Sequence, residues 1–129
     1  MHTILIVDDD VDDIELTRLS LEAVRRDIIV KEALSGAAAL KLIRNGGCCP
    51  DLILLDLKMP GMNGVETLRE IRADARIKGI PVVIVTSSTL ESDLEDANSA
   101  GADGFVHKAF DSSQFNKEIK SALDRWLLG

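Results

Sequence analysis

The chain contains the apolar runs Ile4-Leu5-Ile6-Val7, Leu52-Ile53-Leu54-Leu55 and Val82-Val83-Ile84-Val85, which indicate the architecture of the protein. Each is a continuous run of leucine or β-branched residues, and a polar residue follows it. A strand with one face in water alternates apolar and polar residues, whereas a continuous run is typical of a strand buried on both faces. We therefore predict that these stretches are neighbouring central strands of a parallel sheet.

The segments between these runs predict further strands and helices. Two weaker strands are predicted at Ile28–Ala33 and Gly104–His107, from their positions between helical segments. Apolar residues recur with helical spacing in five other segments, namely Val11–Val24, Ala37–Ile43, Val65–Ile71, Leu90–Ala100 and Phe115–Leu127. Strands that alternate with helices predict an α/β fold, a doubly wound five-stranded parallel sheet with helices on both faces. The functional crevice of such a sheet lies outside the carboxyl ends of its strands.

Length and charge exclude several classes of protein. The 129 residues suit one ordinary domain, so we expect residues 1–129 to form a single domain. The net charge of -7 disfavours partners such as nucleic acid or an anionic membrane. We find no secretory signal and no apolar run near the roughly 20 residues of a membrane span. Cys48 and Cys49 are adjacent, which fits neither a Cys-x-x-Cys pair nor a disulfide framework. A cytoplasmic, reduced protein is predicted.

Polar residues stand at the carboxyl ends of four of the predicted strands. Asp8 and Asp9 follow the first strand, Asp56 the third, Thr86 the fourth and Lys108 the fifth. Three clustered carboxylates repel one another, and each would have a raised pKa unless a cation offset the charge. Oxygen ligands suit a hard divalent ion, and Mg²⁺ is the one we expect in the cytoplasm. The sequence therefore predicts a Mg²⁺ site at this edge of the sheet.

Asp56 is the best candidate for a nucleophile because the third strand is expected beside the first, centrally in the crevice. A carboxylate beside a metal ion can attack an activated phosphoryl group and form an aspartyl phosphate. The other groups then need only position the phosphoryl group and neutralise its charge. We expect Lys108 to pair with one phosphoryl oxygen and Thr86 to donate a hydrogen bond to another.

These residues lie in four recognisable segments, Ile4-Leu5-Ile6-Val7-Asp8-Asp9, Leu54-Leu55-Asp56-Leu57-Lys58-Met59-Pro60-Gly61-Met62-Asn63-Gly64, Val85-Thr86-Ser87 and Phe105-Val106-His107-Lys108. In this order and spacing, over essentially the whole chain, they resemble the receiver domain of two-component response regulators. The resemblance implies a flavodoxin-like (βα)5 fold with strand order 2-1-3-4-5. It also implies a signalling protein and not an enzyme, one that assists its own phosphorylation and dephosphorylation.

The resemblance implies a role for each site residue. Asp56 would be the phosphoacceptor, with a sensor histidine kinase or a histidine phosphotransfer protein as the donor. The implied metal ligands are the carboxylates of Asp9 and Asp56, that of Asp8 partly through water, and the main-chain carbonyl of Lys58. Thr86 and Lys108 would bind the phosphoryl group.

A conformational switch is implied as well. Phosphorylation would draw Thr86 inward, and the aromatic ring of Phe105 would turn into the space left behind. This would repack the face formed by the fourth helix, fifth strand and fifth helix, which is also the face implied for a possible homodimer. The segment Asp12–Thr17 is similar to stand-alone regulators that partner phytochrome-type histidine kinases.

Two features of the sequence leave alternatives open. Lys108 is followed by Ala109 where the family usually has proline, often after a cis bond. A non-proline cis bond costs about 2.5–4 kcal/mol, so this bond is either trans with a rearranged loop or cis under strain. On the first helix, Leu16 and Leu19 lie away from the expected buried side. They are either scattered surface leucines or a docking surface for the helices of a histidine kinase.

Other functions on the same architecture are weighed against the receiver. A flavodoxin-like cofactor binder is disfavoured by the absence of tyrosine and by strand ends rich in acid. An aspartate-dependent phosphatase would need a second aspartate where Lys58 stands. A receiver-like protein-interaction scaffold that is not phosphorylated is suggested only by Ala109. Helix caps are also expected here, from Asp10 for the first helix and from Ser88 or Thr89 for the fourth.

Overall fold

The computed structural model describes residues 1–47, 49–108 and 111–127, and strands alternate with helices along them. In chain order the elements are β1 (His2–Val7), α1 (Val11–Val24), β2 (Ile28–Ala33), α2 (Gly36–Arg44), β3 (Leu52–Leu55), α3 (Gly64–Ala73), β4 (Val82–Thr86), α4 (Glu91–Ala100), β5 (Gly104–His107) and α5 (Ser112–Trp126). The strands form one parallel sheet of order β2-β1-β3-β4-β5. The predicted doubly wound, flavodoxin-like fold and its strand order are confirmed.

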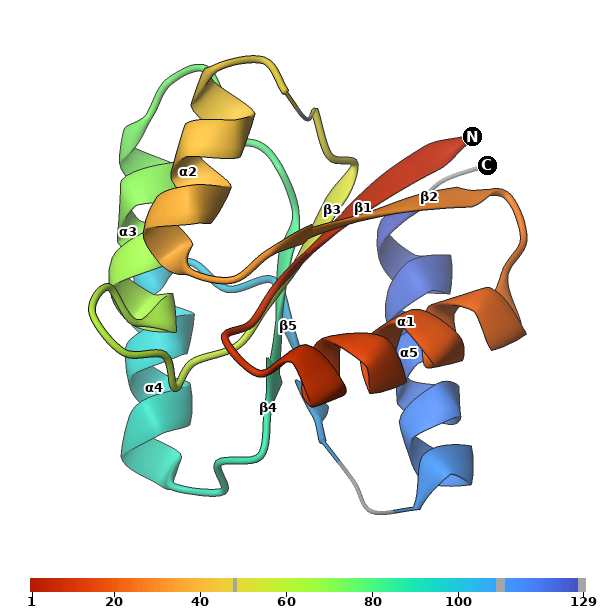
Figure 1. Cartoon of the computed structure of the whole chain (residues 1–129). Coiled ribbons are helices and arrows are strands. Elements are labelled where there is room, and N and C mark those ends of the chain that lie inside the picture. The colour runs from red at the N-terminus through yellow and green to blue at the C-terminus, as the bar shows by residue number, and fades with distance from the viewer. Residues whose placement is uncertain (48, 109–110, 128–129) are drawn as a thin grey trace.

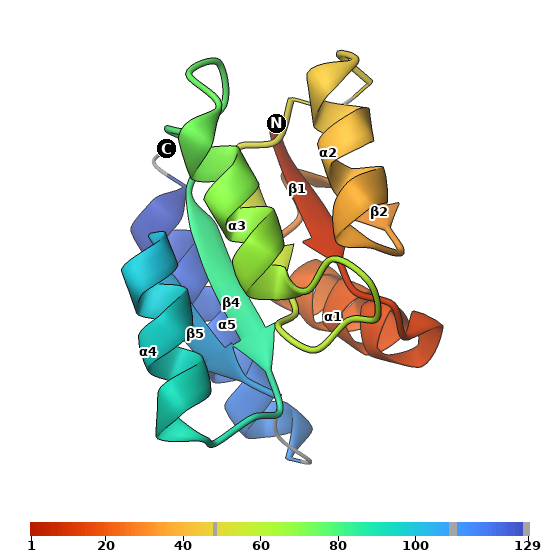
Figure 2. The same ribbon diagram turned by 90° about the vertical axis from the view of Figure 1, so that its left-hand side faces the viewer.

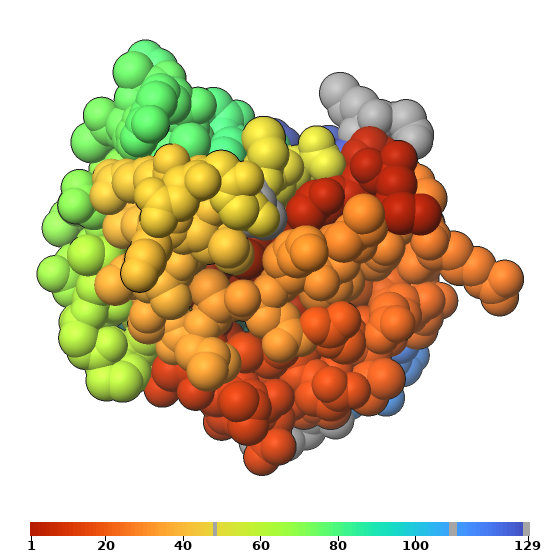
Figure 3. Space-filling view, turned by 45° about the horizontal axis from the view of Figure 1, so that its top comes forward, coloured from red at the N-terminus to blue at the C-terminus, as the bar shows by residue number. Residues whose placement is uncertain are grey.

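The three apolar runs occupy the centre of the sheet. Every residue of β3 and of β4 is buried, and so are the last four residues of β1. β2 and β5 form the two edges and are only partly buried. In the space-filling view of Figure 3 the orange atoms around β2 lie at the molecular surface. The weaker apolar pattern of these two strands is therefore explained by their edge positions.

Helices cover both faces of the sheet. α1 and α5 pack on one face, and α2, α3 and α4 pack on the other, as Figure 1 shows with the sheet between the two groups. Figure 2 looks onto the second group, with α3 between α2 and α4. Alternate residues of each central strand feed the two cores, so that Leu5 and Ile53 face α2 and α3 while Ile4 and Leu54 face α1 and α5. A strand with helices on both faces buries both sets of side chains.

Local capping fixes the starts of the helices that border the carboxyl edge of the sheet. Asp10 caps α1 as predicted, with its side chain accepting from the backbone N–H groups of the next helical turn. Asn63 and Glu66 form a capping box at the start of α3. The cap expected for α4 was wrong, because the N-cap position is Leu90 and no side chain among the described residues caps it. The hydroxyl of Ser88 instead donates a hydrogen bond to the carboxylate of Asp93.

Two further expectations concern membrane-spanning helices and residues that lie outside the described ranges. Within residues 1–47, 49–108 and 111–127, none of the helices combines the length and the apolar character needed to cross a membrane. Cys48 and Ala109, and with Ala109 the bond that follows Lys108, lie outside the described residues. The conformation of that bond therefore stays a prediction.

Candidate functional site: an acidic pocket at the carboxyl edge of the sheet

Asp8 and Asp56 lie side by side because the strands that carry them are paired. β1 and β3 are in parallel register with Val7 opposite Leu55, and each aspartate is the next residue along its strand. The backbone N–H of Asp56 also donates to the carbonyl of Val7 at 3.0 Å. Both carboxylates are buried, with Asp56 only 6 % exposed, whereas Asp9 is exposed. The pairing of these two strands therefore builds the floor of the pocket.

Asp8, Asp9 and Asp56 are arranged as a set of cation ligands. Each offers one carboxylate oxygen, and these oxygens lie within 4.8 Å of one another. Hard divalent cations prefer such oxygen ligands. Bringing three carboxylates together costs electrostatic free energy, which a cation among them would offset. The donor set therefore fits Mg²⁺, and the three aspartates are brought together as the sequence predicts.

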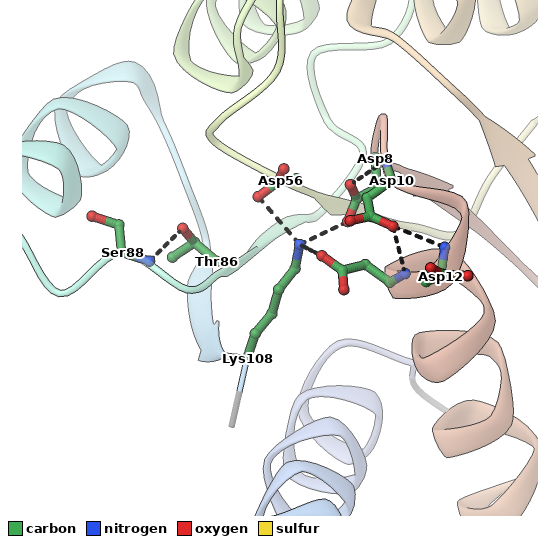
Figure 4. A network of polar contacts seen from close by, with 8 residues as sticks. Asp8, Asp10, Asp12, Asp56, Thr86, Ser88 and Lys108 are labelled. Carbon is green, nitrogen blue, oxygen red and sulfur yellow. Dashed lines mark hydrogen bonds and ion pairs between the residues drawn. The ribbon is translucent and has the colours of Figure 1, made fainter. Parts of the chain in front are cut away.

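Lys108 supplies a positive charge to the same pocket from the end of β5. Its Nζ lies 2.8 Å from Asp8 Oδ2 and 3.5 Å from Asp56 Oδ1, and Figure 4 shows the ammonium between these two residues. The backbone N–H of Lys108 donates to the carbonyl of Thr86 at 2.8 Å, which fixes the base of the side chain beside β4. Only 16 % of the Lys108 side chain is exposed. The ammonium is therefore a fixed part of the pocket.

Asp13 is a site residue that the sequence reasoning missed. Asp13 lies on the first turn of α1, and its Oδ2 is 2.9 Å from Lys108 Nζ. The reasoning searched strand ends, and Asp13 is not at one. Asp9 and the N-cap residue Asp10 precede α1, so helical spacing from the strand-end residues gave no signal for this contact.

The pocket shifts the pKa values of its central groups. The pKa of Asp56 is raised to about 6, chiefly by burial; the charge of Lys108 opposes this shift and the charge of Asp8 adds to it. A backbone hydrogen bond from Lys58 also favours the ionised carboxylate of Asp56. Burial works to lower the pKa of Lys108, but its hydrogen bonds to Asp8 and Asp13 outweigh burial and raise that pKa above its usual value. Near neutral pH the pocket thus holds an ionised Asp56 carboxylate beside a charged ammonium.

Thr86 ends β4 and is connected to Lys58 through a chain of polar contacts. Its Oγ1 accepts a hydrogen bond from the backbone N–H of Ser88 at 3.0 Å, as Figure 4 shows. The Ser88 hydroxyl donates to Asp93 Oδ2 at 2.6 Å, and the same carboxylate oxygen lies 3.0 Å from Lys58 Nζ. This chain connects the ends of β3 and β4 to the first turn of α4.

Phe105 lies apart from the pocket in this conformation. It stands on the edge strand β5 and is 40 % exposed, so its ring faces outward.

A groove of about 580 Å³ borders the pocket on the side of α1 and α5, and Asp13 and Lys108 belong to its lining. Leu16 and Leu19 also line it, and they are 62 % and 55 % exposed. The pocket therefore adjoins an apolar surface.

The fold and the pocket agree with one family of known proteins. Residues 4–120 match the model of the response regulator receiver domain. The chain belongs to this family. The acidic residues Asp8, Asp9 and Asp56 form the pocket that is typical of the metal site of receiver domains. Membership of the family places the chain in two-component signalling and implies a histidine kinase as its partner.

Individual relatives support this assignment. The chemotaxis protein CheY of Pseudomonas aeruginosa is 33 % identical over 118 residues, which are 89 % of this receiver domain and 94 % of CheY. Among solved structures, the phosphorylated cyanobacterial phytochrome response regulator RcpA is 30 % identical with a TM-score of 0.89, covering 98 % of this chain and 94 % of RcpA. The Mn²⁺-bound form of the response regulator Rcp1 is 28 % identical with a TM-score of 0.86, covering 98 % of this chain and 95 % of Rcp1.

Proposed function

We propose that residues 1–129 act as one receiver domain in the cytoplasm, which accepts a phosphoryl group on Asp56 in a Mg²⁺-dependent reaction. The donor is a sensor histidine kinase or a histidine phosphotransfer protein. One observation carries the proposal: the buried carboxylate of Asp56 lies 3.5 Å from the Lys108 ammonium and within reach of two further carboxylates at the same strand edge. The phosphorylated RcpA and the Mn²⁺-bound Rcp1 are consistent with it.

The transfer is a single displacement at phosphorus. A carboxylate oxygen of Asp56 forms the new O–P bond as the P–N bond to the donor imidazole breaks. The imidazole nitrogen keeps the electron pair of the broken bond and takes up a proton. Because burial raises the pKa of Asp56 only to about 6, the carboxylate is ionised at neutral pH and available for attack.

The rest of the pocket positions the phosphoryl group and balances its charge. Lys108 pairs with one phosphoryl oxygen, and the hydroxyl of Thr86 turns from Ser88 to donate to another. Asp8, Asp9 and Asp56, with the main-chain carbonyl of Lys58, hold Mg²⁺. When bound there, the cation offsets the charge of the carboxylates and of the third phosphoryl oxygen.

Output depends on a change of surface. When Thr86 moves toward the phosphoryl group, the outward ring of Phe105 turns into the vacated space, so that the face of α4, β5 and α5 is repacked. This face is the proposed site of partner binding and of a possible homodimer. The free energy for the change comes from the new contacts of the phosphoryl group with Thr86 and Lys108.

The groove beside α1 is the proposed docking site of the phosphodonor protein. Leu16 and Leu19 offer exposed apolar area next to the pocket, and they line one groove with Phe115 of α5. A helix with an apolar stripe fits such a groove. Docking there would bring the phosphohistidine to the carboxyl edge of the sheet, where Asp56 lies.

The direct test is intact-mass analysis after incubation with acetyl phosphate, with and without Mg²⁺. We expect the wild type to gain the mass of one phosphoryl group only when Mg²⁺ is present. Asp56→Asn should gain none, and Asp51→Asn, which removes an exposed carboxylate at the opposite end of the same strand, should behave as the wild type. No gain in the wild type would contradict the proposal and favour an interaction scaffold that is not phosphorylated.

A further inference from the structure

Asp13 makes a contact that phosphoacceptance on Asp56 does not explain. Metal binding uses the carboxylates at the strand ends, and phosphoryl binding uses Thr86 and Lys108. Asp13 stands on the first turn of α1, and its Oδ2 lies 2.9 Å from Lys108 Nζ. Asp12, the residue before it, has an exposed side chain, and its backbone N–H donates to the capping carboxylate of Asp10. The contact with Lys108 is therefore specific to Asp13 and not a general property of this acidic turn.

The Lys108 ammonium lies at different distances from its three carboxylate neighbours. Its Nζ lies 2.8 Å from Asp8 and 2.9 Å from Asp13, but 3.5 Å from Asp56. The ammonium is therefore bonded to Asp8 and Asp13, and its contact with the nucleophile is longer. Figure 4 shows dashed lines from Lys108 to Asp8 on one side and to Asp56 on the other.

Phosphorylation changes the balance of these contacts. A phosphoryl group on Asp56 carries about two negative charges in place of the single charge of the ionised carboxylate, and it brings three strong acceptor oxygens beside the ammonium. The positive charge of Lys108 is then drawn toward those oxygens and away from α1. Asp8 would retain a counter-charge in the bound cation, whereas Asp13 would lose its partner. The Asp13–Lys108 pair thus favours the unphosphorylated state over the phosphorylated one.

We propose that Asp13 is a positioning residue that holds Lys108 toward α1 in the unphosphorylated protein and thereby opposes occupation of the phosphoryl site. This inference rests on the proposed function of Asp56. The effect is measurable because the pair is partly shielded from solvent, with side-chain exposures of 16 % for Lys108 and 35 % for Asp13. Charge-assisted hydrogen bonds are stronger than neutral ones when solvent is partly excluded. We expect removal of the charge at Asp13 to tighten binding at the phosphoryl site by about three- to tenfold.

The experiment measures the affinity for beryllofluoride, a phosphoryl mimic, by ¹⁹F NMR at saturating Mg²⁺. It compares the wild type with Asp13→Asn, Asp13→Glu and Asp12→Asn. Asp12→Asn makes the same change of net charge on the same helical turn without touching Lys108, so it reports the general electrostatic effect. A second readout is the ¹⁵N resonance of Lys108 Nζ in the metal-free proteins, which we expect to move in Asp13→Asn and to stay in place in Asp12→Asn.

The outcomes separate the inference from the function on which it rests. Tighter binding by Asp13→Asn than by Asp12→Asn, with Asp13→Glu returning toward the wild type, supports the inference. Equal affinities of Asp13→Asn and Asp12→Asn would overturn it, and so would weaker binding by Asp13→Asn, while the proposed function would stand. If the wild type itself binds no beryllofluoride, the proposed function fails and the inference fails with it.

Discussion

The guanidinium of Arg72 on α3 and the carboxylate of Asp103 before β5 form an ion pair, with Nη2 2.7 Å from Oδ2. The same guanidinium donates to the carbonyls of Gly101, Lys78 and Ile80 at 2.7–3.0 Å. The same oxygen of Asp103 accepts from the backbone N–H of Val82 at 2.8 Å. One side chain therefore joins α3, the end of α4 and the starts of β4 and β5.

Arg72→Ala should lower the free energy of unfolding by about 2–3 kcal/mol. The substitution leaves the partly buried carbonyls of Gly101 and Ile80 without this donor and removes the positive charge beside Asp103, and buried polar groups are costly when unpaired. Urea denaturation followed by circular dichroism measures the change. Arg69→Ala, which removes an exposed arginine one turn earlier on α3, should stay within about 0.5 kcal/mol of the wild type. Equal effects of the two variants would contradict this prediction.

Gly64→Ala should destabilise the protein and impair phosphorylation together. A Cβ at this position would lie 2.3 Å from the backbone oxygen of Asp56 and 2.7 Å from Cα of Leu57, so the start of α3 would have to move away from the nucleophile. We expect a loss of about 2–4 kcal/mol in unfolding free energy and slower mass gain with acetyl phosphate. Gly79→Ala is the matched control because no atom of the described residues lies within 4 Å of its Cβ position. A normal phosphorylation rate in Gly64→Ala would contradict the prediction.

Asp56→Asn should stabilise the metal-free protein at pH 7.5. The pKa of Asp56 is about 6 in the folded protein against 3.8 for an unperturbed aspartate side chain, so ionisation costs more when the chain is folded. The free-energy cost of ionising Asp56 in the folded protein is fully present above about pH 6. It shrinks as the pH falls between the two pKa values and is absent below the pKa of the unperturbed side chain. Removing it should add on the order of 2–3 kcal/mol at pH 7.5.

Urea denaturation in EDTA from pH 4 to pH 8 tests this dependence. The difference between Asp56→Asn and the wild type should grow as the pH rises. Asp12→Asn, the same substitution at an exposed site, should show a much smaller change over this range. A difference between Asp56→Asn and the wild type that stays constant with pH would show that burial of the charge is not its cause.

Leu16→Glu should slow phosphotransfer from a histidine kinase that phosphorylates the wild type, by about tenfold or more. A charge placed in the groove beside α1 would have to lose its water when an apolar helix docks. Phosphorylation by acetyl phosphate should be unchanged, because a small donor does not use the groove. Leu34→Glu is the control, since Leu34 is 53 % exposed outside the groove. An equal loss with both donors would discard docking at this groove.

The central strands and the strand-end residues could be predicted because their signals are local. A continuous apolar run identifies a strand buried on both faces, and the parallel arrangement brings the following residues to one edge. Asp8, Asp9 and Asp56 could therefore be grouped from the sequence. The N-cap of α4 could not be placed in this way, because four hydroxyl residues in succession, Thr86 to Thr89, offer equivalent caps. The contact that decides it, Ser88 with Asp93, forms only in the folded chain.

Asp13 shows the limit of reasoning from strand ends. Its contact with Lys108 joins residues 95 positions apart, and it depends on the direction in which α1 leaves the sheet. Sequence spacing places Asp13 on a helical turn but not against a particular strand. The exposure of Phe105 is likewise set by the edge position of β5 and not by the residue itself.

The contacts of Arg72 give α4 two unequal ends. Its carboxyl end is anchored at Gly101, which has a left-handed backbone with φ 106°, and the anchor is the guanidinium. Its amino end has no capping side chain in the described part of the chain, and Asp93 connects it to the pocket through Ser88 and Lys58. We therefore expect α4 to pivot about Gly101 when the pocket rearranges. A small displacement at Thr86 would then rotate the whole helix about its carboxyl end, which Arg72 holds in place.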